Sequence, residues 1–183
     1  MKLSISLPGM CHLKILHLQS NNIGSPVGPQ LARALAECPH VEEISLSENS
    51  FGDSGVRVFS EELPRLTQLR KIELKLCEIS DCSSKPLVLS MSCCPLIEEI
   101  ILSWNSLGDE SALQLAMVLP VMTRLRILDL DKNLITAHGA SRLAESLAQS
   151  PGIQIVRLWK NQIPKNVEEN LGKQDSRLHF SFF

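Results

Sequence analysis

Four pairs of adjacent glutamates are the first residues whose types and spacing suggest chemistry, because two neighbouring carboxyl groups can act as acid and base in catalysis. They are Glu42/Glu43, Glu61/Glu62, Glu98/Glu99 and Glu168/Glu169. Consecutive side chains of a strand point to opposite faces, so a pair adjacent in the sequence of a strand does not form a catalytic dyad. The five histidines are scattered, and no Ser, Cys or Asp has the spacing to relay protons with them. We therefore predict no enzyme activity.

Six cysteines are the other reactive group, and they lie at positions 11, 38, 77, 82, 93 and 94. They contain no CxxC pair, and no histidine cluster stands near them to complete a zinc site. A chain of 183 residues can build a full hydrophobic core and does not depend on disulfides. The cysteines therefore predict reduced thiols in a cytosolic or nuclear protein, with no metal and no cofactor.

The overall composition limits the classes of partner. The chain has 18 Lys and Arg against 20 Asp and Glu, a net charge of −2, without the basic excess that binding to a phosphate backbone requires. No stretch of 18 apolar residues exists that could span a membrane, and Pro8 and Gly9 interrupt the first apolar segment. We expect a soluble, non-secreted protein that contacts neither nucleic acid nor membrane directly.

The elements that would position any site come from a motif that recurs every 28 residues without insertion. It has the form LxxLxLxx(N/C)xL, which is the leucine-rich repeat signature. Its six copies start at positions 13, 41, 69, 97, 125 and 153, as LKILHLQSNNI, VEEISLSENSF, LRKIELKLCEI, IEEIILSWNSL, LRILDLDKNLI and IQIVRLWKNQI.

Each repeat predicts one strand and one helix. Leu128 and Leu130 alternate with Asp129 at the period of a strand, and Leu143 and Leu147 follow at helical spacing before Pro151. Such a unit buries its apolar face only by stacking on the next copy. We predict an α/β solenoid of the ribonuclease-inhibitor-like horseshoe type, with a parallel sheet on the concave side and helices on the convex side.

The two ends differ from the six full repeats. Residues 1–12 align Leu3 and Leu7 with the helical positions of the next repeat, which predicts a partial repeat and a longer protein upstream. Residues from about 164 to 183 lose the consensus, and the segment holds Leu171 and a terminal aromatic group. That group is Phe180, Phe182 and Phe183. We predict that this segment is the cap of a single domain covering residues 1–183.

The ninth repeat position carries an asparagine in five of the six copies. A buried Asn side chain offers two donors and an acceptor to loop backbone groups that have left the sheet, so we predict a structural ladder. Cys77 occupies this position in the third repeat, and Cys38 and Cys94 take a later apolar position as small core residues. The ladder consists of Asn21, Asn49, Cys77, Asn105, Asn133 and Asn161.

Two repeat segments, ISLSENSFGDSGV (44–56) and LDLDKNLITAHGA (128–140), resemble repeats of the NOD-like receptors. The tail PKNVEENLGKQDSRLHFSFF (164–183) is similar to the C-terminal ends of the MHC transactivator branch of that family, class I and class II. The resemblance implies a parent protein with a nucleotide-binding domain, an innate-immune role in regulating MHC gene expression through protein partners, and a cytoplasmic location with traffic to the nucleus. The chain itself has no GxxxxGK[ST] motif.

Positions three, five, seven and eight of each repeat are predicted to line the concave face. Leu76 and Trp104 share position eight in neighbouring repeats, and a large apolar group on a polar face indicates a binding site. The alternative is that the rings fold over neighbouring loops, with Lys132 or Lys160 stacked on them. The predicted partner-binding set is Trp104, Trp159, Leu76, Ile101, Ile127, Ile155, Asp129, Asp131 and Arg157.

The expected occupant of this face is another protein or the nucleotide-binding domain of the parent chain. A second hypothesis from a different class is the repeat part of a GTPase-activating or ribonuclease-inhibitor-type protein. GTPase activation would require a positioning residue at the rim, and no residue in the sequence is singled out for that role.

The first strand, residues 13–18, is expected to present an unpaired edge, because the repeat that would cover it is incomplete. We predict lower stability or self-association at this end. Hydrogen exchange measures this directly: amides of the first repeat should exchange faster than those of the fourth. Equal protection of both repeats in a monomer would contradict the prediction.

Overall fold

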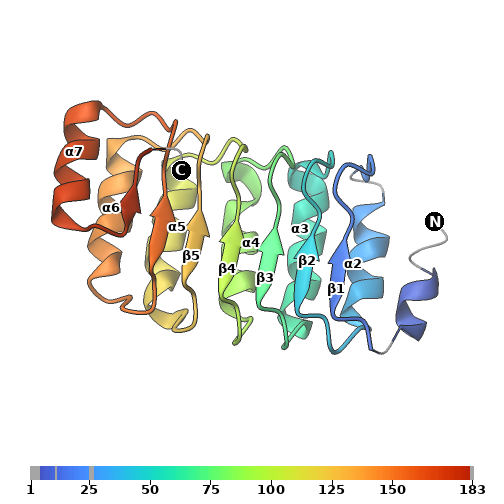
Figure 1. Cartoon of the computed structure of the whole chain (residues 1–183). Coiled ribbons are helices and arrows are strands. Elements are labelled where there is room, and N and C mark those ends of the chain that lie inside the picture. Colours follow the sequence, from blue (N-terminus) through green and yellow to red (C-terminus); the bar gives the residue numbers. More distant parts are fainter. Residues whose placement is uncertain (1–4, 11, 25–26, 182–183) are drawn as a thin grey trace.

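A computed structural model describes residues 5–10, 12–24 and 27–181. The repeats follow one another along one axis and together form two layers (Figure 1). One layer is a seven-stranded parallel sheet in the order β1-β2-β3-β4-β5-β6-β7. The strands are β1 (Ile15–His17), β2 (Glu43–Ser45), β3 (Lys71–Glu73), β4 (Glu99–Ile101), β5 (Ile127–Asp129), β6 (Ile155–Arg157) and β7 (Leu178–His179).

The second layer consists of one helix per repeat behind the sheet. These are α2 (Gly28–Ala36), α3 (Gly52–Glu62), α4 (Asp81–Ser92), α5 (Asp109–Val118), α6 (Ala137–Leu147) and α7 (Lys165–Gln174). Short 3-10 turns lie at Leu7–Gly9, Leu63–Arg65 and Leu119–Val121, each with a proline at its start. The predicted fold class, a leucine-rich repeat solenoid, is confirmed.

The constant repeat length sets the register of the sheet. Ile44 of β2 pairs with Ile72, which pairs with Ile100, which pairs with Leu128. Because no repeat from β1 to β6 contains an insertion, equivalent residues stack on one another, and these four side chains are all buried.

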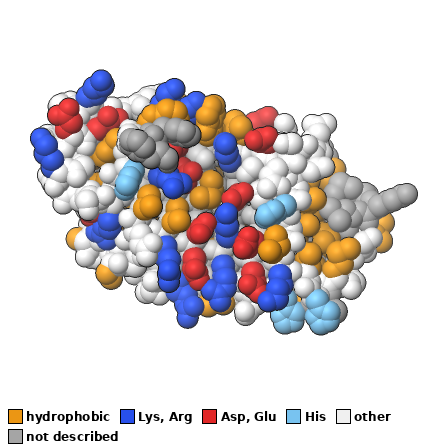
Figure 2. All heavy atoms as spheres, viewed as in Figure 1, with side chains coloured by type: hydrophobic (Ala, Val, Ile, Leu, Met, Phe, Trp, Pro, Cys, Tyr) orange, Lys and Arg blue, Asp and Glu red, His pale blue; other side chains and the backbone are white. Residues whose placement is uncertain are grey.

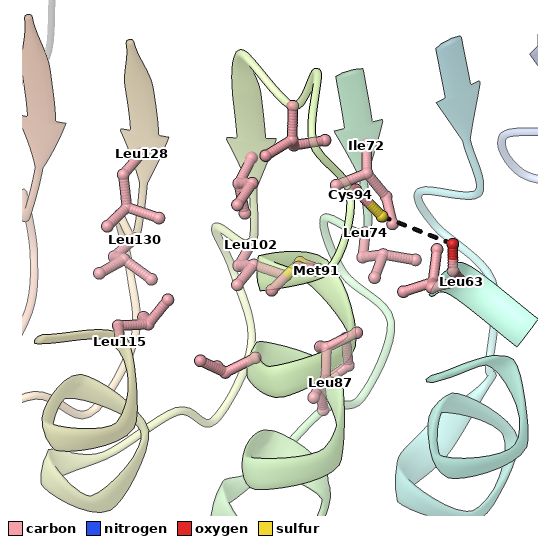
Figure 3. Close-up of a cluster of buried hydrophobic side chains, with 14 of the residues drawn as sticks. Leu63, Ile72, Leu74, Leu87, Met91, Cys94, Leu102, Leu115, Leu128 and Leu130 are labelled. Atoms are coloured by element: carbon pink, nitrogen blue, oxygen red, sulfur yellow. Dashed lines mark hydrogen bonds between the residues drawn. The ribbon is translucent and has the colours of Figure 1, made fainter. Parts of the chain in front are cut away.

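The core fills the space between the two layers. Figure 3 shows Leu74 and Leu102, which follow β3 and β4, together with Leu87 and Met91 of α4, and all four side chains are buried. Cys94 lies in the same core, and its thiol donates a hydrogen bond of 3.5 Å to the carbonyl of Leu63. Burial raises the pKa of Cys94 to about 12, so the thiol stays protonated and packs as a small apolar group.

Asn49 illustrates how the loops of neighbouring repeats are joined. Its Oδ1 accepts hydrogen bonds from the backbone amides of Asn21 (3.1 Å) and Ile23 (2.9 Å) in the previous repeat. Its Nδ2 donates to the carbonyls of Leu18 and Leu46, at 2.8 Å each. One buried side chain therefore satisfies backbone groups on two successive loops.

Other ladder positions make equivalent contacts. Asn105, Asn133 and Asn161 bond the same backbone positions of the repeat before them, and the thiol of Cys77 donates to the Leu46 carbonyl at 3.3 Å. Asn21 differs from the prediction, because its side chain is exposed and its Nδ2 donates within its own repeat. Its strand, β1, is an outer strand of the sheet, and among the described residues no preceding loop offers the backbone partners found at the other ladder positions.

A second ladder, which the sequence analysis missed, joins the helices. The carboxylates of Asp53, Asp81 and Asp109, 28 residues apart, each accept hydrogen bonds at the start of the following helix. Asp109 accepts from the Thr136 amide at 2.8 Å and from the Gly139 amide at 3.1 Å. A Cβ on Gly139 would lie 2.5 Å from the Asp109 carboxylate, so the contact depends on glycine.

The pKa values of this second ladder reflect its hydrogen bonds. Partial burial raises the pKa of Asp109, but the side-chain and backbone donors of Thr136 and the Gly139 amide outweigh burial, and its pKa is below the ordinary value. The same balance of burial against serine donors lowers the pKa of Asp53. Both carboxylates are therefore charged acceptors at neutral pH.

The C-terminal segment is a shortened seventh repeat. Leu178 of β7 pairs with Val156 of β6, and Leu171 of α7 is buried. The Arg177 guanidinium donates to the carbonyls of Leu147 (3.0 Å) and Ser150 (3.1 Å) at the end of α6. Of the other residues expected in the end repeats, Leu3, Phe182 and Phe183 lie outside the described residues.

Replacing Asn49 with alanine tests the contribution of the ladder to stability. Asn49→Ala leaves several buried backbone groups without partners, each costing on the order of 1–3 kcal/mol, so we expect a loss of about 3 kcal/mol. Urea unfolding measures the loss. Asn21→Ala is the matched control, because its side chain is exposed, and should cost less than about 1 kcal/mol. Equal effects of the two substitutions would show that burial of the ladder is unimportant.

Candidate functional site

The predicted binding residues lie on the sheet face that points away from the helices. Figure 2 shows this face, on which Lys and Arg side chains are interspersed with Asp and Glu side chains. Lys71 lies 2.8 Å from the Glu73 carboxylate and 3.6 Å from that of Glu99. Beside it, Arg70 contacts Glu98. Most of the charge over β2 to β4 is therefore neutralised by neighbours on the same face.

Position eight has a backbone conformation that is unusual for its residue types. Leu76 has a φ of 53°, Trp104 of 59°, Lys132 of 50° and Lys160 of 54°, all in the left-handed region that is disfavoured for residues with a Cβ. Each strand ends just before this position, and the Trp104 amide donates to the Asp131 carbonyl of the next repeat at 2.8 Å. Position eight thus forms a row along the carboxyl ends of the strands.

Two tryptophans and three lysines gather in this part of the face, and we call Lys75, Trp104, Lys132, Trp159 and Lys160 the Trp–Lys cluster. The Lys132 ammonium lies 3.1 Å from the centroid of the Trp104 ring and 5.3 Å from that of Trp159. Lys160 lies 4.6 Å from the Trp159 ring, and Lys75 lies 5.9 Å from the Trp104 ring. These distances are in the range of cation–π interactions.

The stacked lysine does not close off the site. The residue Trp104 is 40% exposed and Leu76, in the same row, is 41% exposed. The two alternatives for Trp104, a ring stacked on a lysine and a ring exposed to a partner, therefore occur together. Trp159 is half-buried.

The lysines of the cluster carry charge that the described residues do not neutralise. Among those residues, no Asp or Glu oxygen lies within ion-pair distance of the Lys75, Lys132 or Lys160 ammonium. Partial burial, followed by the positive charges of Lys160 and Lys75, lowers the pKa of Lys132. The three ammonium groups therefore repel one another across the two rings.

The two aspartates expected on the open surface are buried instead. Asp129 and Asp131 are 8% and 7% exposed. The Asp131 carboxylate accepts from the Trp159 amide at 2.8 Å, and the Asp131 amide donates to the Asp129 carboxylate at 3.0 Å. The carboxylates accept hydrogen bonds from the adjacent backbone and do not face solvent, which corrects their predicted placement on the open surface.

Asp131 has an unusual pKa as a result. Burial, and then the negative charge of Asp129, raises the pKa of Asp131 to about 6, although the Trp159 amide and Arg157 act in the opposite direction. The Arg157 guanidinium that acts on Asp131 lies 3.9 Å from the Asp129 carboxylate. The carboxyl group beneath the Trp–Lys cluster is thus partly protonated near pH 6.

The three isoleucines of the predicted set are all half-buried. Ile127 pairs with Ile155 in register, whereas Ile101 pairs with Asp129. The apolar surface is therefore divided into an isoleucine pair at position three and the more exposed Leu76 and Trp104 at position eight.

The described residues contain no group of three or more His, Cys, Asp or Glu side chains arranged to hold a metal ion. Within the same residues, none of the helices has the length and apolar character needed to cross a bilayer.

Comparison with known proteins shows the class to which this fold belongs. A family model described as Leucine Rich repeat matches residues 9–26, 37–60 and 93–116. An internalin from Listeria monocytogenes is structurally similar with a TM-score of 0.59 at 16% sequence identity, over 97% of this chain and 50% of that chain. The protein is a leucine-rich repeat protein.

Sequence relatives define the branch. Protein NLRC5 of Homo sapiens is 49% identical over 172 residues, which is 94% of this chain and 9% of that protein. The MHC class II transactivator of Homo sapiens is 34% identical over 94% of this chain and 16% of that protein. Over nearly its whole length the chain is therefore similar to a leucine-rich repeat region of NOD-like receptors of the MHC transactivator type. It spans less than a fifth of the length of either relative.

Asp131→Asn tests the electrostatics under the cluster. A carboxyl group whose folded pKa is raised favours folding most when protonated, so its contribution is full below pH 4 and is lost as the pH rises through about 6. We expect Asp131→Asn to raise the free energy of unfolding by about 2 kcal/mol at pH 7 and much less at pH 4, as measured by urea unfolding.

Asp175→Asn provides a control of opposite sign. The hydrogen bond and charge of Arg177 lower the pKa of Asp175, so that carboxylate stabilises the fold at pH 7 and the substitution should destabilise it there. If Asp131→Asn is destabilising at pH 7, the two aspartates are not in the repulsive arrangement described.

Proposed function

We propose that this chain is a non-enzymatic protein-recognition module that binds a partner on its concave sheet face. The observation that supports this most directly is the pair Leu76 and Trp104, both about 40% exposed and next to the charged side chains of β3 and β4. Tryptophan is prominent among the residues that dominate binding energy, and exposed apolar groups on a polar face mark interaction sites.

The backbone supports the same proposal. Leu76 and Trp104 adopt the left-handed conformation at a cost of the order of 1–2 kcal/mol each. Hydrogen bonds from each amide to the next repeat fix the chain at that point, so both side chains are held before a partner arrives. A preorganised surface loses little conformational entropy on binding.

The family supplies the biological setting. As a repeat region of the MHC transactivator type, the chain would act in innate immunity and the regulation of MHC gene expression, in the cytoplasm and the nucleus. The face has two candidate occupants in the proposal: a separate protein, or the nucleotide-binding domain of the parent chain in an autoinhibited state. Crosslinking distinguishes the two occupants, because the adduct contains either a second protein or the parent chain alone.

Site-specific photo-crosslinking in the full-length protein tests this proposal. A p-benzoylphenylalanine at Leu76 should give adducts whose yield falls about tenfold when Trp104→Ala is added, because the ring forms part of the contact. The mass of each adduct identifies either a partner protein or the nucleotide-binding domain. The control probe replaces Met117, which is exposed on α5 on the convex side.

The proposal fails if adducts form at position 117 and not at position 76. It also fails if Trp104→Ala leaves the adducts at position 76 unchanged while the circular dichroism spectrum shows a folded protein.

A further inference from the structure

The Trp–Lys cluster indicates what kind of partner segment the face accepts. We propose that it binds an extended acidic peptide segment, with at least two carboxylates contacting the lysines and an apolar side chain resting against Trp104 and Leu76. This inference rests on the proposed function and specifies its ligand class.

Uncompensated charge distinguishes the cluster from the rest of the sheet face. Lys71 is paired with two glutamates, and Arg70 is paired with Glu98. The ammonium groups of Lys132 and Lys160, by contrast, lie over tryptophan rings, and no carboxylate of the described residues pairs with them. An ammonium group held on a ring without a counterion gains from an incoming carboxylate and has no existing ion pair to break.

Mutual repulsion strengthens this argument. The positive charges of Lys160 and Lys75 act on Lys132, which is also partly desolvated. A negatively charged group placed among the three lysines would relieve that repulsion as well as form new contacts. Asp131 forms no ion pair with these lysines, because its buried carboxylate is turned to the Trp159 amide, from which it accepts a hydrogen bond.

The repeat geometry matches an extended peptide. Lys132 and Lys160 occupy the same position in neighbouring repeats, whose strands are about 4.8 Å apart, and Lys75 lies two repeats before Lys132. Alternate side chains of an extended peptide lie on one side about 7 Å apart, within the reach of flexible lysine side chains. The intervening open surface of Trp104 and Leu76 is apolar, which selects an apolar residue beside the acidic ones.

A nucleic acid fits this face less well than an acidic peptide. A phosphate backbone requires a continuous basic track, and here the cluster adjoins a face that carries Glu73 and Glu99. The net charge of the chain, −2, also opposes long polyanions. A short acidic segment contacts the three lysines without extending over the glutamates.

Fluorescence anisotropy with three labelled probes tests the inference. They are the acidic peptide GEELEEG, its neutral counterpart GQQLQQG and a short single-stranded oligothymidylate. We expect the purified chain to bind the acidic peptide at least tenfold more tightly than the neutral one, and added salt to weaken the binding.

The matched variants place the binding site. Lys132→Gln/Lys160→Gln keeps polar side chains at both positions and removes two charges, so affinity for GEELEEG should fall about tenfold. Lys85→Gln/Lys173→Gln removes two exposed lysines of α4 and α7 and should leave the affinity unchanged. Circular dichroism verifies that both variants are folded.

Three results overturn the inference: no preference for the acidic over the neutral peptide, no loss of affinity in the Lys132/Lys160 variant, or tighter binding of oligothymidylate than of the acidic peptide. These results leave the proposed function standing if the probe at Leu76 still forms adducts that depend on Trp104. If the crosslinks fail and the acidic peptide binds with the expected lysine dependence, the ligand class holds and the proposed cellular role fails.

Discussion

The interaction on which the structure depends is the set of hydrogen bonds between equivalent loops of successive repeats. A repeat of 28 residues contains one short strand and one helix, too little to bury its own apolar face. Stacking supplies the core, but it also brings loop backbone groups away from water. Asn49, Asn105, Asn133 and Asn161 satisfy those groups, and they do so only when the next repeat is in register. The hydrogen bonds that satisfy the buried loop backbone therefore also fix the register between neighbouring repeats.

The need to contact neighbouring repeats distinguishes the residues that hold the fold together from those that are available for binding. The strand residues that face the helices, the ladder residues and the aspartates at the helix starts are all committed to neighbouring repeats. Position eight has a fixed backbone, because its amide bonds to the next repeat, while its side chain is free to vary among Ser, Glu, Leu, Trp and Lys. The site arises where this row holds large apolar and cationic residues together, from Leu76 to Lys160.

The sequence predicted those features that repeat at a fixed spacing with a recognisable residue type. The solenoid, the concave sheet and the location of the Trp104 side chain on it follow from the period alone. The ladder of Asp53, Asp81 and Asp109 also repeats every 28 residues, but acidic residues near helix starts are common on surfaces, and the amides that donate to these carboxylates lie in the next repeat. The strand β7 was missed because residues 164–183 lack the consensus, although Arg177 and Leu178 restore the contacts of a repeat.

The burial of Asp131 was not predictable from position, since the equivalent residues of other repeats range from an exposed Gln19 to a buried Ser103. It depends on the neighbour that the carboxylate contacts, here the Trp159 backbone amide that donates to it. The positive φ at position eight was also hidden, because Leu and Trp give no sign of a left-handed conformation in a sequence.

The chain has two tryptophans, so its ¹H–¹⁵N spectrum should contain two indole signals, which Trp104→Phe and Trp159→Phe assign. Titration with the acidic peptide tests directly whether the Trp–Lys cluster is the recognition site. Both indole signals should shift in a saturable way as the peptide is added. Shifts confined to amides of α4 and α5, with both indole signals unmoved, would contradict it.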